Sequence, residues 1–192
     1  MTNTNADTVK TRPAKKKSWS AVIVFAAILV IVAGGFGGLA ITNSIATSRY
    51  ADVDGVGSLS IPRLGADFAI PIVAGTSLKD LRQGVGWYDG TAPAGQIGNF
   101  ALTGHRLGWG QPFADLGSLQ VGDEIQVTTD NGTFIYHVIT GPTVVSDKET
   151  DVLAAVPGDP DRTPNKALIT LITAASWLPS PDRIVVIGEL AD

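Results

Sequence analysis

Apolar and polar residues alternate along most of the chain beyond residue 56, a pattern typical of β-strands with one buried face. The alternation is clearest in residues 57–62, 68–72, 124–129 and 133–138. Shorter or continuous apolar runs predict further strands at residues 99–102, 143–145, 167–173 and 183–190. About seven or eight short strands with few helices indicate a mainly β fold, either a closed barrel or a sandwich.

Breaks in this pattern predict the connections. Asp130-Asn131-Gly132 stands between two alternating runs and predicts a β-hairpin. Glycine and proline recur through residues 84–98, which predicts a long loop. Pro71 lacks an amide proton, so we expect it at a sheet edge or a bulge. Residues 76–82 and 147–155 predict two short helices.

Residues 19–41 form an uncharged apolar run, and about 20 such residues suffice to cross a bilayer as a helix. Lys15, Lys16 and Lys17 precede it, which places the N-terminus in the cytoplasm. A cleaved signal peptide is the alternative, but its apolar core is usually shorter, about 7–15 residues. We therefore expect a single-pass protein of the cell membrane. Its expected parts are a basic cytoplasmic tail (1–18), a transmembrane helix (19–41), a stalk (42–56) and an extracellular β-domain (57–192).

Charge is distributed unevenly between these parts. Residues 1–18 contain five basic residues and one acidic residue, a net +4, whereas the chain from Thr42 onward contains nine basic and seventeen acidic residues, a net −8. An acidic globular part argues against a nucleic-acid partner. The chain has no cysteine and only two histidines, which excludes thiolate-ligated metal sites and histidine-rich ones. We expect no metal and no other cofactor.

Two polar residues stand where a rigid strand could aim them. His105 follows the apolar run 99–102, and Arg183 opens the last apolar run. A histidine in such a place can act as a general base, and an arginine can stabilise a developing oxyanion. Taken alone, each also has a simpler interpretation, as a structural histidine or a solvated end charge.

Two other features carry weaker signals. Ser176 lacks the Gly-x-Ser-x-Gly context of a nucleophilic serine. An acidic cluster lacks the regular ligand spacing of a calcium loop, so we interpret it as a solvated loop. Its members are Asp147, Glu149, Asp151, Asp159 and Asp161.

Two groups of motifs, one around His105 and one around position 174, occur in an order that resembles a known family. Residues 84–91, 98–106 and 109–113 are similar to the stretch around the catalytic histidine of sortases. Thr170-Leu-Ile-Thr-Ala174 resembles the sortase signature Thr-Leu-x-Thr-Cys, and an arginine stands nine residues later, as in the class E group. The resemblance covers the whole β-domain and implies the closed sortase β-barrel of about eight strands.

Sortases are cysteine transpeptidases. Their thiolate attacks a Leu-Pro-x-Thr-Gly-like or Leu-Ala-x-Thr-Gly-like sorting signal between Thr and Gly, and an amine of a cell-wall precursor or a pilin resolves the thioester. The resemblance implies that His105 is the general acid/base and that Arg183 stabilises the oxyanion. It also implies that Thr173 lines the substrate groove and that Trp109 contacts the sorting signal. The implied partners are sorting-signal peptides and the acceptor amine.

Position 174 departs from the family, because alanine occupies the place of the nucleophilic cysteine. A methyl group cannot attack a carbonyl, and loss of the nucleophile in a comparable triad costs about a million-fold in turnover. We therefore expect this chain to be inactive or to trap its substrate. Two interpretations stay open. The cysteine of a transpeptidase has been replaced, or the chain is a natural pseudosortase that serves as a non-catalytic binding module for surface proteins.

Overall fold

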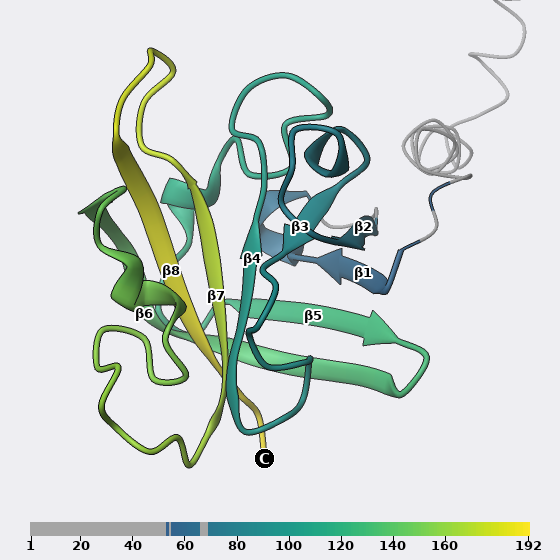
Figure 1. Cartoon of the computed structure of the whole chain (residues 1–192). Helices are drawn as coiled ribbons and strands as arrows, with labels where there is room; N and C mark the ends of the chain where they lie inside the picture. Colours follow the sequence, from purple (N-terminus) through teal and green to yellow (C-terminus); the bar gives the residue numbers. More distant parts are fainter. Residues whose placement is uncertain (1–52, 54, 66–68) are drawn as a thin grey trace, which may run out of the picture. The chain divides into compact units, whose positions relative to one another are not determined.

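A computed structural model describes residues 53, 55–65 and 69–192, and in these residues the chain forms a closed barrel of eight strands with four 3-10 turns (Figure 1). The mainly β barrel expected from the alternating pattern and the resemblance is confirmed. The strands are β1 (Gly57–Ser60), β2 (Ile70–Ala74), β3 (Val85–Trp87), β4 (Gly98–Thr103), β5 (Glu124–Thr129), β6 (Gly132–Ser146), β7 (Ala167–Ala174) and β8 (Asp182–Leu190). The turns are η1 (Pro62–Leu64), η2 (Asp80–Arg82), η3 (Leu116–Ser118) and η4 (Thr150–Leu153).

Neighbouring strands pair in the order β1-β2-β3-β4-β7-β8-β6-β5, and β5 pairs with β1 to close the barrel. Most pairs are antiparallel, but β2 runs parallel to β3 and β4 runs parallel to β7. Closure leaves no edge strand open to unwanted pairing. The parallel β4–β7 pair brings two strand ends from distant parts of the sequence side by side (Figure 1).

The β5–β6 hairpin is confirmed where the turn signal predicts it. Thr129 pairs with Gly132, which leaves a two-residue loop, and Gly132 has φ 125°. Glycine adopts a positive φ without the steric cost that a side chain brings. β6 then continues to Ser146 and joins both strands predicted in this part of the chain into one.

The loop predicted for residues 84–98 is wrong near its start, because β3 occupies Val85–Trp87. Gly86 lies within this strand and not in the loop that the recurrence of glycine indicates. A Cβ at this position would overlap the Gly75 carbonyl oxygen and would lie 2.8 Å from Leu81 Cδ2. The glycine therefore lets a neighbouring backbone approach the strand closely, which is one of the roles of glycine within sheets.

The expectation that Pro71 lies at an edge or bulge is also wrong, since β2 pairs on both sides. The carbonyl oxygen of Pro71 faces Gly84 so closely that an added Cβ there would overlap it. The proline nitrogen faces the same side, and the ladder with β3 begins one residue later, at Ile72. The missing amide proton is therefore not needed for a ladder hydrogen bond.

Both predicted short helices occur as single 3-10 turns, η2 within residues 76–82 and η4 within residues 147–155. Reciprocal hydrogen bonds support η2. Ser77 Oγ donates to Asp80 Oδ2 at 2.6 Å, and the Asp80 amide donates to Ser77 Oγ at 3.3 Å. This exchange satisfies an amide that the start of a helix would otherwise leave free.

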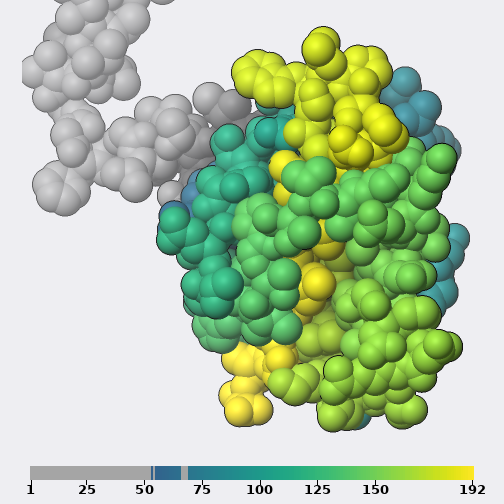
Figure 2. Space-filling model, turned by 90° about the vertical axis from the view of Figure 1, so that its left-hand side faces the viewer, coloured from purple at the N-terminus to yellow at the C-terminus, as the bar shows by residue number. Residues whose placement is uncertain are grey.

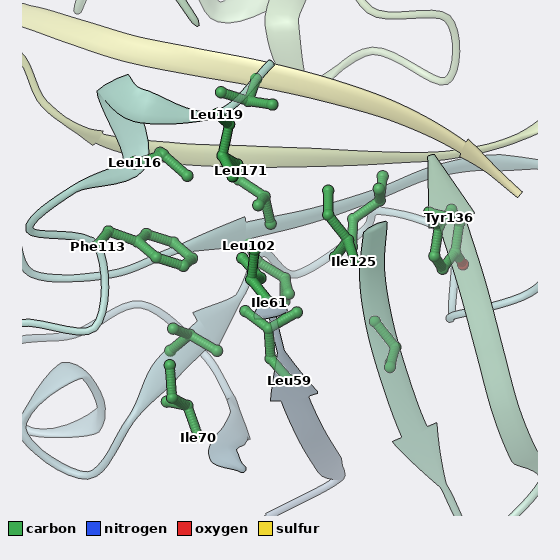
Figure 3. Packing of buried hydrophobic residues seen from close by; sticks show 14 of the residues in the cluster. Leu59, Ile61, Ile70, Leu102, Phe113, Leu116, Leu119, Ile125, Tyr136 and Leu171 are labelled. Carbon is green, nitrogen blue, oxygen red and sulfur yellow. The ribbon is translucent and has the colours of Figure 1, made fainter. Parts of the chain in front are cut away.

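One hydrophobic cluster fills the barrel (Figure 3). Leu59 of β1, Leu102 of β4 and Leu171 of β7 are fully buried. Alternate residues of a strand point to the same face, so the period-two pattern of the sequence supplies these inward side chains. Burying each of them contributes about 1.5–3 kcal/mol, which makes the barrel a rigid support for groups at its ends.

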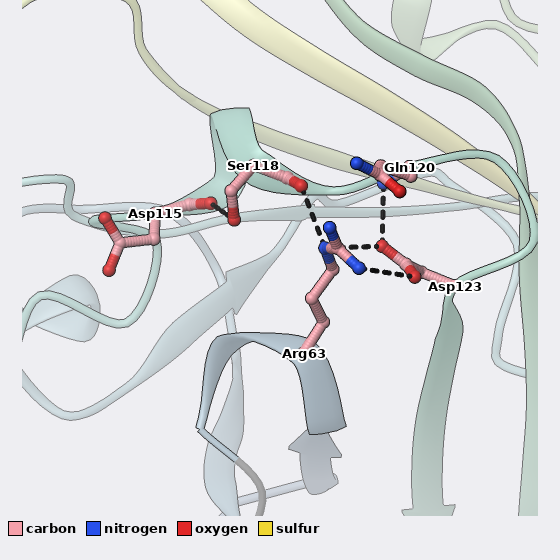
Figure 4. Close-up of polar contacts among 5 residues, drawn as sticks. All are labelled: Arg63, Asp115, Ser118, Gln120 and Asp123. Atoms are coloured by element: carbon pink, nitrogen blue, oxygen red, sulfur yellow. Dashed lines mark hydrogen bonds and ion pairs between the residues drawn. The ribbon is translucent and has the colours of Figure 1, made fainter.

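A polar seam ties η1 to the segment that precedes β5 (Figure 4). Arg63 Nε donates to the Ser118 carbonyl oxygen at 3.0 Å and lies 3.2 Å from Asp123 Oδ2. The same carboxylate oxygen accepts the Gln120 amide at 2.7 Å. Arg63 thus has both a carbonyl and a carboxylate as partners, and its role is structural.

The predicted cytoplasmic tail, transmembrane helix and most of the predicted stalk lie outside the described residues, as does Phe68 of the second predicted strand. Within the ranges that the structure describes, no helix combines the length and the apolar character needed to cross a membrane.

Candidate functional site

The candidate site lies where the parallel strands β4 and β7 end. Their pairing finishes with Thr103 opposite Ile172, and the Gly104 amide still donates to the Ile172 carbonyl oxygen at 3.2 Å. Continuing this register by two residues sets His105 level with Ala174. The carboxyl ends of parallel strands meet at one edge of the sheet, so the two residues come from distant parts of the sequence to the same place.

β8 adds the third residue. Ala174 and Arg183 are direct partners in the antiparallel β7–β8 pair. Residues directly opposite each other place their side chains on the same face of the sheet, with Cβ atoms about 4.5–5.5 Å apart. The methyl group of Ala174 and the first carbons of the Arg183 side chain therefore share one face.

A cavity of about 480 Å³ at this edge is lined by His105, Ala174 and Arg183 together. Trp177 and Leu178, in the loop between β7 and β8, contribute exposed apolar walls. This loop is the raised connection between β7 and β8 in Figure 1 and the yellow cap at the top of Figure 2. The structure thus brings together the three positions that the sequence singles out.

His105 is suited to act as a base. Its Nε2 atom is buried and has no hydrogen-bond partner in the described part of the chain. Burial lowers the pKa of His105 from its ordinary value of 6.5, and the positive charge of Arg82 lowers this pKa further. The imidazole is therefore neutral at neutral pH and can accept a proton, as a general base must.

Arg183 is held by the backbone next to it. Its Nη1 donates to the carbonyl oxygens of Ser180 and Asp182, each at 3.0 Å. Within the described residues, no ion pair involves Arg183. A guanidinium carries five N–H donors in a fixed fork, so Arg183 keeps donors for a ligand in the cavity.

Sequence reasoning misses Arg106, the residue directly after the predicted base. Its Nη1 donates to the carbonyl oxygens of Ala174 at 3.1 Å and Ala175 at 2.5 Å, and the residue lines the same cavity. The bonds connect the loop after β4 to the end of β7. The signal that could have found Arg106 is its place beside His105 within the motif of residues 98–106.

Thr173 is not among the residues that line the cavity. It is 2% exposed, and its hydroxyl donates to the Gly104 carbonyl oxygen at 2.9 Å. The hydroxyl thus joins the ends of β4 and β7, while contact between Thr173 and a substrate stays a prediction.

Trp109 is 54% exposed and is not among the residues that line the cavity. The Arg82 guanidinium carbon lies 4.3 Å from the centre of its ring, a cation–π contact. Its φ of 49° is in the left-handed region, which costs a residue with a side chain about 1–2 kcal/mol. Contact between Trp109 and a sorting signal stays a prediction.

A smaller cavity of about 180 Å³ continues from the first, because Tyr88 and Arg183 line both. Leu153 of η4, Ile172 of β7 and Val185 of β8 give it apolar walls. We call these two neighbouring cavities the groove, and Tyr88 and Arg183 lie at their junction.

A buried amide fixes the η4 wall of this groove. Asn99, which is 1% exposed, donates from Nδ2 to the carbonyl oxygens of Val152 at 3.0 Å and Ala154 at 3.1 Å. Its Oδ1 accepts the Thr170 hydroxyl at 2.7 Å. Three partners satisfy the amide, which holds the end of η4 against β4.

Ser176 and the acidic cluster lie in different surroundings. Ser176 lines the larger cavity, and its hydroxyl oxygen accepts the Leu178 amide at 3.1 Å. All five members of the acidic cluster are exposed, in agreement with a solvated loop. In the described part of the chain, no three His, Cys, Asp or Glu residues are grouped so that they could hold a metal ion.

Comparison with known proteins adds family evidence to this geometry. The model of the sortase domain matches residues 59–191. Sortase SrtE1 of Streptomyces coelicolor is 34% identical over 145 residues, which cover 72% of this chain and 41% of the relative. The chain thus spans less than half the length of that protein.

Solved structures of sortases share the fold. The SrtA sortase from Actinomyces oris superimposes with a TM-score of 0.67 at 33% identity, covering 72% of this chain and 80% of the other. Sortase E1 from Streptomyces coelicolor, solved with a tripeptide in the active site, gives a TM-score of 0.64 at 35% identity, covering 72% and 88%. Together with the matching domain model, these likenesses show that the chain belongs to the sortase family.

Proposed function

We propose that this chain binds the sorting signal of surface proteins in the groove at the ends of β4 and β7, and that a cysteine at position 174 would make it a transpeptidase. The observation that carries the proposal is the convergence of His105, Ala174 and Arg183 on one cavity. The apolar residues in the wall of the adjoining cavity support a peptide ligand, as does the tripeptide in the active site of the similar sortase E1.

These three positions support the following chemistry. A thiolate at position 174 would attack the threonine carbonyl carbon of a Leu-Pro-x-Thr-Gly-like or Leu-Ala-x-Thr-Gly-like signal. Neutral His105 would take the thiol proton and give it to the departing glycine amine, while Arg183 would stabilise the oxyanion. A cell-wall or pilin amine would then displace the sulfur. Ala174 supplies no nucleophile, so the present chain is proposed to hold the peptide without cleaving it.

A second candidate function is that of a non-catalytic binding module. The observation that favours it is the methyl group of Ala174 inside an otherwise complete cavity. Codon 174 in the DNA of the natural source separates the two candidates. A cysteine codon there indicates a transpeptidase, and an alanine codon indicates a pseudosortase.

We also propose that residues 19–41 anchor the chain in the cell membrane with the barrel outside. The uncharged run and the lysines before it support this orientation. Protease added to intact cells should digest the barrel and spare the N-terminal tail. A barrel that resists the protease until the cells are lysed would contradict the orientation.

The central experiment is the Ala174→Cys variant with a Leu-Pro-x-Thr-Gly-type peptide. Mass spectrometry should detect a thioester between the protein and the peptide, and release of the fragment that begins with glycine. A small added amine should capture the thioester in place of water, so that an amide forms instead of the acid, as expected of a transpeptidase. A folded variant that binds the peptide but never acylates would favour the binding module. One that neither binds nor acylates would overturn the proposed function.

A further inference from the structure

We infer that the cavity at the ends of β4 and β7 is a binding site for the C-terminal carboxylate of a peptide. Two guanidinium groups, those of Arg106 and Arg183, line this cavity together with Ala174. The inference deepens the proposed function and rests on it for the identity of the peptide. A sorting signal carries such a carboxylate once the bond between its threonine and glycine has been hydrolysed.

The charge balance of the cavity is unusual for this chain. From Thr42 onward seventeen acidic residues outnumber nine basic ones, yet the described residues that line the cavity include no aspartate or glutamate. The two ion pairs formed within the described residues use other cations, so neither Arg106 nor Arg183 has a carboxylate partner there. Both arginines are partly buried, and a carboxylate is the partner that matches a guanidinium best. A ligand can supply it.

Both guanidinium groups are already held in place. Nη1 of Arg106 is bound to the carbonyl oxygens of Ala174 and Ala175, and Nη1 of Arg183 to those of Ser180 and Asp182. These bonds use one nitrogen of each group and leave donors on the rest of the fork. A carboxylate matches such donors because its two oxygens accept parallel N–H bonds. Fixed donors also reduce the entropy lost on binding.

The residue at position 174 determines which anion the two guanidinium groups can bind. In a sortase with cysteine, a thiolate at this position would stand beside the same cations. Ala174 brings no charge and little volume, so the site lacks an internal anion and has room for one from a ligand. The nearest acidic side chains on the groove, Asp147 and Glu149, lie in the adjoining cavity beyond Arg183. They would repel a carboxylate there and favour its placement beside Ala174.

The groove indicates that the anion belongs to a peptide and not to a small ion. Arg183 and Tyr88 stand at the junction of the two cavities. A carboxylate at the two arginines would let the residues that precede it extend past this junction, along the apolar wall formed by Leu153 and Val185. Affinity should therefore depend on both the terminal carboxylate and the preceding side chains.

Calorimetric titration of the full chain tests the inference with a matched pair of peptides. Both end in Leu-Pro-Ala-Thr, one as the free acid and one as the C-terminal amide. The acid should bind about tenfold more tightly, which is about 1.4 kcal/mol. Equal affinities for acid and amide would overturn the carboxylate site.

Three variants locate the site. Arg183→Gln should abolish the preference for the acid. Ala174→Asp should abolish it as well, because it keeps both arginines but places a carboxylate of the protein beside them. Arg162→Gln is the matched control, since Arg162 lines a separate cavity, and it should keep the preference. A preference that survives both Arg183→Gln and Ala174→Asp would overturn the proposed position.

Two further peptides separate this inference from the proposed function. If an uncleaved peptide that continues through Thr-Gly binds as tightly as the acid, the proposed function stands and the carboxylate site falls. If a scrambled peptide acid binds as tightly as the matched acid, and its amide does not, the carboxylate site stands and recognition of a sorting signal falls. Failure of every peptide to bind would overturn both.

Discussion

Asn99 and His105 belong to the same stretch of chain, Asn99 in β4 and His105 just after it, yet their surroundings differ. Asn99 is buried with a partner for its oxygen and two carbonyl acceptors for its nitrogen. His105 has a buried Nε2 atom for which the described residues provide no partner. The first environment stabilises one conformation of the barrel, and the second leaves the hydrogen-bonding capacity of a nitrogen unused.

The arginines repeat this contrast. Arg63 has a carboxylate partner in Asp123, whereas Arg106 and Arg183 bind only backbone carbonyls within the described residues. Asn99 and Arg63, whose side chains have their hydrogen-bond or ion-pair partners, stabilise the fold. His105, Arg106 and Arg183, which keep unused hydrogen-bonding atoms, line a single cavity. Substitutions in the two kinds of region should affect different measurements.

The largest effect should come from His105→Ala in the Ala174→Cys background. Loss of a general acid/base typically slows a reaction by about 10²–10⁴-fold, so thioester formation should fall by that factor while the unfolding midpoint changes little. A quench-flow experiment, in which mass spectrometry quantifies the thioester at each time point, measures the rate. His137→Ala, at an exposed position of β6, is the control and should leave the rate unchanged. An unchanged rate in His105→Ala would remove its role as a base.

Asn99→Ala should have the largest effect on stability. It leaves two carbonyl oxygens and the Thr170 hydroxyl without their partner, at a cost of about 3 kcal/mol in the free energy of unfolding. Urea denaturation measures this loss, and Asn165→Ala at an exposed position should stay within about 0.5 kcal/mol of the parent. A loss as small as that of the control would show that the Asn99 network is not a structural element.

The pKa of His105 gives a third test. Because the folded-state pKa lies below the ordinary 6.5, the unfolded chain takes up the proton first as the pH falls. This group therefore lowers the free energy of unfolding as the pH falls through 6.5 and toward its folded pKa. The loss should be smaller in His105→Gln. NMR titration should show a His105 pKa below 6.5 that rises in Arg82→Gln. A parent value at or above 6.5 would contradict the burial argument.

The smallest effect should come from Asp123→Asn in the Arg63 seam. The Arg63 side chain is 40% exposed, so water and salt screen its attraction to the carboxylate. Such pairs contribute about 0.2–1 kcal/mol, and the amide keeps an oxygen that can accept hydrogen bonds. Thermal unfolding at low and high salt should show a small loss that shrinks further with salt. A large, salt-independent loss would place this pair among the major supports of the fold.

Most strands could be predicted because their signal is local. Alternation along β5 and β6, with glycine at the start of β6, is enough to place that hairpin. β3 could not be recognised in the same way, because Gly86 reflects a close approach by the Gly75 backbone and not a loop. The position of Pro71 likewise depends on where the ladder with β3 begins.

The residues of the candidate site also differ in whether a local sequence signal identifies them. His105 and Arg183 could be predicted because they stand at strand ends within recognisable motifs. The supporting role of Thr173 depends on a carbonyl 69 residues away, and that of Arg106 on carbonyls 68 and 69 residues away. Periodicity and spacing contain no record of such distant bonds.

The parallel pairing of β4 with β7 also has a consequence for the order in which the molecule forms. During synthesis β4 leaves the ribosome well before β7 and β8, and the hydrogen bond between Thr173 and Gly104 spans 69 residues. Contacts this distant in sequence form slowly, because a long loop must close first. No nascent chain that ends before Arg183 can contain the cavity. A peptide that binds there recognises only the closed barrel, so it should raise the free energy of unfolding by RT ln(1 + [L]/Kd) and make the melting temperature rise with peptide concentration.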